Sequence, residues 1–102
     1  MFENTDLKNG VIEYDNFTWL IDHSTFINNI DHLTEDLLQI SFFENSYIID
    51  VGWYSGKKFS VFLIKDLDWD DPMAFIKVKT PNSVVDLIPL VVDLIYFDKS
   101  HS

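Results

Sequence analysis

The chain of 102 residues has no cysteine and no arginine, and only three glycines and three prolines. The lack of cysteine excludes disulfides, thiolate catalysis and cysteine-based zinc sites. Seven lysines stand against 17 acidic residues, so the formal net charge is −10. Such a surface disfavours nucleic acid and anionic membranes, because binding to phosphate depends on basic side chains.

Long apolar runs are also missing. No run approaches the roughly 20 residues that a membrane-spanning helix requires. Met1–Asp6 offers neither the basic start nor the apolar segment of a secretory signal. We therefore expect a cytoplasmic protein that does not enter a membrane.

Apolar residues are plentiful, at 47% of the chain, and 16% of the residues are aromatic. That content suffices for one hydrophobic core and is atypical of a disordered chain. A chain of this length is most simply one domain, residues 1–102, and we expect its polar residues 1–9 to be frayed.

Apolar spacing predicts the elements of this domain. Residues 10–21 alternate loosely, as in one or two short strands, whereas residues 24–40 have apolar side chains at spacings of three and four, which predicts a helix. Residues 47–54 and 57–64 flank Ser55-Gly56, a strong signal for a hairpin. With a two-residue loop, the expected pairs are Trp53 with Lys58, Val51 with Ser60, and Asp50 with Val61.

The remaining segments complete the predicted fold. Residues 73–79 alternate as a further strand, and Thr80-Pro81-Asn82-Ser83 is a helix start signal. A second helix over residues 83–97 must start late or bend at Pro89; a strand over residues 90–97 is the alternative. The expected class is α+β: a mostly antiparallel sheet of four to five strands with two helices packed on it.

One segment, Lys65-Asp66-Leu67-Asp68-Trp69-Asp70-Asp71-Pro72, concentrates negative charge around a tryptophan. Proline interrupts regular strand pairing there, which predicts an exposed loop. Asp66, Asp68 and Asp70 match the first, third and fifth positions of an EF-hand. However, Asp71 stands where that loop needs glycine, and Lys77 stands where it needs glutamate. We therefore predict no metal site.

Enzymatic signatures are absent as well. There is no nucleophile elbow and no glycine-rich phosphate loop. A glycosidase needs only two carboxyl groups at the right separation, so a chain with 17 acidic residues meets this requirement without indicating such an activity. His23 and His32 lack a third partner at metal-binding spacing. We predict neither an enzyme nor a cofactor.

Binding of a basic protein accounts for more of these features. Clustered aspartates attract and pair with cationic groups, and tryptophan is a frequent anchor at interfaces. Trp69 either enters a partner's pocket or folds back over the core, and both alternatives remain open. The expected partner-binding residues are those of the acidic segment and of the hairpin tip: Asp66, Asp68, Trp69, Asp70, Asp71, Trp53 and Tyr54.

In size, acidity, lack of cysteine, aromatic content and order of elements, the chain resembles bacterial toxin immunity proteins, including those of contact-dependent growth inhibition and colicin-like systems. The resemblance implies a one-to-one complex with a cognate basic toxin, most simply a nuclease, whose active site is covered in the cytoplasm. Two alternatives stay open: a phage-encoded acidic mimic of nucleic acid that inhibits a host enzyme, and a structural or assembly subunit.

Overall fold

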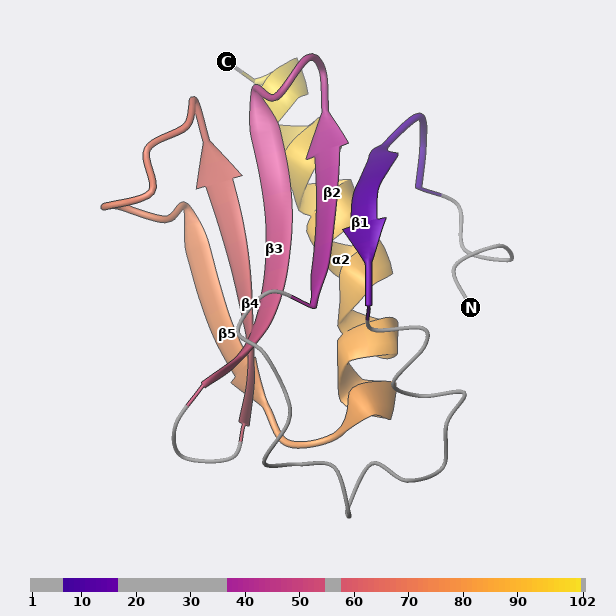
Figure 1. Ribbon diagram of the computed structural model, residues 1–102. Coiled ribbons are helices and arrows are strands. Elements are labelled where there is room, and N and C mark those ends of the chain that lie inside the picture. Colours follow the sequence, from indigo (N-terminus) through magenta and orange to yellow (C-terminus); the bar gives the residue numbers. More distant parts are fainter. Residues whose placement is uncertain (1–6, 17–36, 55–57, 102) are drawn as a thin grey trace.

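A computed structural model describes residues 7–16, 37–54 and 58–101 (Figure 1). Most of the predicted first helix, residues 24–36, lies outside these ranges, as does the part of the predicted first strand region beyond residue 16.

The described residues form a five-stranded sheet with strand order β1-β2-β3-β4-β5, in which every neighbouring pair is antiparallel. This α+β architecture confirms the predicted sheet. Within the described ranges it contains a single helix, α2, in place of the two that were predicted. The elements are β1 (Val11–Asp15), β2 (Leu38–Phe42), β3 (Tyr47–Tyr54), β4 (Lys58–Lys65), β5 (Ala74–Val78) and α2 (Pro81–Ser100).

The prediction that the first helix extends to residue 40 is wrong. Leu38–Phe42 is strand β2, which pairs with β1 on one side and β3 on the other. Leu37 and Ile40, assigned by their spacing to a helical face, are instead buried in the core around this strand. Short apolar runs fit both periodicities, and here pairing with two neighbouring strands decides the conformation.

The hairpin between β3 and β4 is confirmed, but its predicted register is shifted by one residue. Trp53 pairs with Phe59, Val51 with Val61, and Asp50 with Phe62. Tyr54 and Lys58 form the last pair, so residues 55–57 make the connection where two residues were expected. A shift of one residue moves side chains to the opposite face, and this register places Phe59, Val61 and Leu63 in the core.

Helix α2 covers one face of the sheet and contributes to the core (Figure 1). It presents buried side chains at helical spacing to alternate residues of β2, β3 and β4. The helix contributes Val84, Ile88, Val91, Val92 and Ile95, and the strands contribute Leu38, Ile40, Phe42, Tyr47, Ile49, Val51, Phe59, Val61 and Leu63.

The start of α2 follows its sequence signal. The Thr80 hydroxyl accepts a hydrogen bond from the Ser83 amide at 3.1 Å, and Pro81 occupies the first turn.

The helix runs through the exposed Pro89, so neither a late start nor the alternative strand over residues 90–97 is found. Five buried side chains on both sides of Pro89, at about 1.5–3 kcal/mol each, outweigh the roughly 3 kcal/mol that an interior proline costs.

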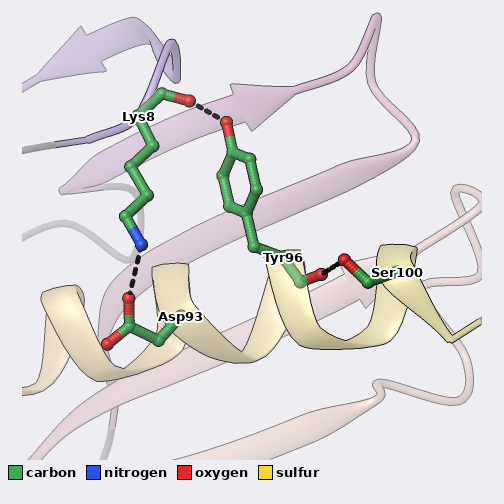
Figure 2. A network of polar contacts seen from close by, with 4 residues as sticks. All are labelled: Lys8, Asp93, Tyr96 and Ser100. Carbon is green, nitrogen blue, oxygen red and sulfur yellow. Dashed lines mark hydrogen bonds and ion pairs between the residues drawn. The ribbon is translucent and has the colours of Figure 1, made fainter.

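The segment before β1 is tied to α2 (Figure 2). The Lys8 ammonium lies 2.9 Å from the Asp93 carboxylate, and the Tyr96 hydroxyl donates to the Lys8 carbonyl oxygen. Lys8 belongs to the segment expected to be frayed, yet these contacts hold it against the helix.

Candidate functional site

The acidic loop, residues 66–71, connects β4 to β5 through two consecutive turns. The Asp68 amide donates to the Lys65 carbonyl at 3.1 Å, and the two residues between them, Asp66 and Leu67, have φ of 55° and 59°. Positive φ at both central residues is the geometry of a type I′ turn. A second bond, from the Asp71 amide to the Asp68 carbonyl at 3.4 Å, folds the rest of the loop. The aspartates therefore sit on a defined backbone.

The loop presents acidic and apolar side chains to solvent together. All four of its aspartates are exposed. Trp69 is 46% exposed and Leu67 is 57% exposed. Trp69 therefore does not close over the core, which was one of the two alternatives that the sequence left open; its entry into a partner's pocket stays a prediction. Leu67 was not among the expected binding residues, because nothing in the sequence distinguishes it from a core leucine.

A hollow of about 540 Å³ opens beside the loop. Three aspartates and one lysine line it, together with a proline and a methionine. The lining residues are Lys65, Asp66, Asp68, Asp71, Pro72 and Met73. A hollow lined by aspartates and by apolar side chains suits a cationic side chain, which can pair with a carboxylate while its aliphatic stem contacts the apolar wall.

The base of the loop is fixed to the last turn of α2. The same Asp98 oxygen accepts a hydrogen bond from the Tyr47 hydroxyl at 2.5 Å and lies 2.8 Å from the Lys65 ammonium. The hydrogen bond from Lys65, followed by that from Tyr47, lowers the pKa of Asp98. The hydrogen bond between Lys65 and Asp98 raises the pKa of Lys65. The pKa of Tyr47 is raised mainly by burial of its hydroxyl and, to a smaller extent, by the hydrogen bond to Asp98. The charge of Lys65 is thus matched by Asp98.

The turn between β2 and β3 lies at the same end of the molecule (Figure 1). The Asp66 amide donates to the Ser46 carbonyl at 2.9 Å, which joins this turn to the acidic loop. Phe43, Glu44 and Asn45 all have positive φ although none is glycine. The Phe43 ring packs edge-on against Tyr96, with 5.2 Å between ring centres. The turn lacks the glycine that normally accompanies positive φ, and its sequence signal is limited to Asn45-Ser46.

The hairpin tip does not join the acidic loop. Trp53 is half-buried against the core, with its ring centre 4.9 Å from that of Phe59. It lies at the opposite end of β4 from the loop, and eight residues of strand span roughly 23 Å. The side chain of Tyr54 lies outside the described part of the structure. Of the seven expected binding residues, the structure therefore brings together Asp66, Asp68, Trp69, Asp70 and Asp71.

Within residues 7–16, 37–54 and 58–101, no group of three or more histidine, aspartate or glutamate side chains is placed to hold a metal ion. No helix in the same ranges combines the length and apolar character needed to cross a membrane. Comparisons with protein families, with curated proteins and with solved structures give no match to this chain. Its function must therefore be argued from the chemistry of the acidic loop.

Proposed function

We propose that this protein binds and neutralises a cognate basic toxin, most simply a nuclease, in the cytoplasm and without a cofactor or catalytic step of its own. One observation carries the proposal: a folded loop presents four exposed aspartates around two exposed apolar side chains, Leu67 and Trp69.

The charge of the loop is available to a partner. Among the described residues, Lys8 pairs with Asp93 and Lys65 pairs with Asp98, and neither of these ion pairs involves a loop aspartate. Placing basic groups of a partner against these carboxylates forms charge-assisted hydrogen bonds, which are stronger than neutral ones. The excess of negative charge over the whole chain accelerates the encounter.

The exposed apolar side chains of the loop provide binding energy that charge pairs alone do not. Trp69 and Leu67 stand among the carboxylates, so a partner that pairs with the aspartates also buries an aromatic and an aliphatic surface. Buried aromatic anchors carry much of the binding energy of interfaces, whereas charges at the rim mainly set association rate and specificity. A nuclease suits this surface, because its substrate-binding groups must be basic to contact phosphate.

Protection of cells tests the proposal directly. An immunity gene lies beside its toxin gene, so we would express the product of the neighbouring reading frame with and without this protein. Growth should stop with the neighbour alone and resume with both. Protection should fail when Asp66, Asp68, Asp70 and Asp71 are all replaced by Asn. No toxicity of the neighbour, or full protection by this variant, would contradict the proposal.

Binding kinetics with the purified toxin separate the two kinds of contact. Asp70→Asn with Asp71→Asn should slow association at low salt and flatten its salt dependence. Asp86→Asn, a control on α2 that leaves the Lys8–Asp93 ion pair intact, should alter both much less. Trp69→Ala should weaken affinity by roughly 30-fold, mainly through faster dissociation. Leu90→Ala, an exposed apolar control on α2, should leave affinity unchanged.

A further inference from the structure

Strand β5 forms an outer edge of the sheet. Within the described ranges it pairs with β4 on one side only, and in Figure 1 no described segment lies along its outer side. Ala74, Ile76 and Val78 are half-buried on the side of α2, and Phe75 is 51% exposed on the other side. An edge strand with apolar side chains on both faces is a template for a further strand.

Charges of opposite sign lie at the two ends of this edge. Asp70 and Asp71 precede the strand, in the acidic loop that projects beyond β5 in Figure 1. Lys77 and Lys79 lie at the other end, and both are exposed. None of these four side chains makes an ion pair with a described residue. The edge thus carries both signs, separated along the strand.

We propose that β5 pairs with β5 of a second copy of this chain, antiparallel and around a twofold axis near Ile76. That register places Lys77 opposite the partner's Phe75, and Lys79 opposite the partner's Met73, next to the partner's Asp70 and Asp71. Because the axis is twofold, each contact occurs twice.

The charge pattern of the β5 edge favours a second copy of the same strand, running antiparallel to the first. An edge with acids at one end and lysines at the other is complementary to itself when the strands run antiparallel. A parallel pair would place lysines beside lysines, and like charges directly opposite one another destabilise a sheet. A purely basic partner strand would fit the acidic end and be repelled from the other. A second copy satisfies both ends.

In the proposed dimer, Lys77 keeps an aromatic neighbour. Its ammonium lies 5.6 Å from the centre of the Phe75 ring of its own chain. Across the axis it faces the partner's Phe75 on the same face of the continuous sheet, where cross-strand pairs are in contact. The contact area of one five-residue strand is small, so we expect a weak dimer with a dissociation constant in the micromolar range or above.

Sedimentation velocity of the purified chain, with no toxin present, tests this proposal independently of the proposed function. From about 10 to 500 µM protein at moderate salt, where the repulsion between two copies of net charge −10 is screened, the wild type should shift from monomer to dimer. A monomer throughout this range overturns the proposal. Toxin binding by a strictly monomeric protein would leave the proposed function standing.

Substitutions that reverse one charge at either end of β5 test the proposed antiparallel pairing of the two copies. Lys79→Glu and Asp71→Lys should each weaken self-association about tenfold, because each replaces two attractive contacts by two repulsive ones. An equimolar mixture of the two variants should associate again, since the carboxylate introduced in one variant then meets the ammonium group introduced in the other. Lys99→Glu and Glu44→Lys make the same charge changes away from β5 and should have little effect. Failure of the mixture to restore association overturns the proposed pairing.

Discussion

Truncation of Ile88 to alanine tests how α2 is docked. Ile88 is fully buried against the sheet, and the substitution removes three side-chain carbons. At about 0.8 kcal/mol per buried CH₂, the lost transfer free energy is roughly 2.4 kcal/mol, and the remaining cavity raises the cost to about 3–4 kcal/mol. The better helix propensity of alanine returns about 0.4 kcal/mol of this. We therefore expect the free energy of unfolding to fall by roughly 3 kcal/mol.

The matched control is Leu90→Ala, two residues further along the same helix. Leu90 is 64% exposed, so its truncation should change the free energy of unfolding by no more than about 0.5 kcal/mol. Urea titrations followed by tryptophan fluorescence and by circular dichroism measure both variants. In thermal melts, the Ile88 variant should melt roughly 10–25 °C lower than the wild type. Equal losses for the two variants would refute the docked orientation of α2.

Three further predictions concern the ends of the sheet. The hydrogen bond from Lys65 holds the pKa of Asp98 below that of an unfolded chain, so its stabilising effect is present above about pH 4 and is lost as pH falls through the folded pKa. The stability difference between wild type and Asp98→Asn should thus shrink in urea titrations taken from pH 6 towards pH 2.5; a constant difference would contradict this pairing. Gly10→Ala should destabilise the fold by about 1–3 kcal/mol in the same assay, because the added Cβ would lie 2.5 Å from the buried Phe42 ring; unchanged stability would mean that this ring moves freely. Leu67→Gly should raise stability by roughly 0.5–1 kcal/mol by relieving a positive φ, yet weaken toxin binding through loss of an exposed side chain; lower stability would argue against the observed turn.

The acidic loop could be located from the sequence because its signals are local. A proline after four aspartates interrupts the strand, and the alternation of residues 73–79 predicts where the next strand begins. For the same reason, Thr80-Pro81 indicated the start of α2, since a cap and a first-turn proline act within a few residues. The sequence also indicated an antiparallel sheet, because the turn at Ser55-Gly56 lies between two apolar runs.

Contacts between distant residues decided the rest. Residues 38–42 form a strand because β1 and β3 bond to both of their edges, which no local pattern records. Trp53 packs against Phe59 because burial of the facing strand sets the register of the hairpin. Asp98 meets Lys65 and Tyr47 only after α2 is packed on the sheet, with 33 and 51 positions of chain between them. Local composition thus determined where charge and turns lie, whereas packing determined which side chains stay at the surface, because burial is a property of the assembled sheet and helix.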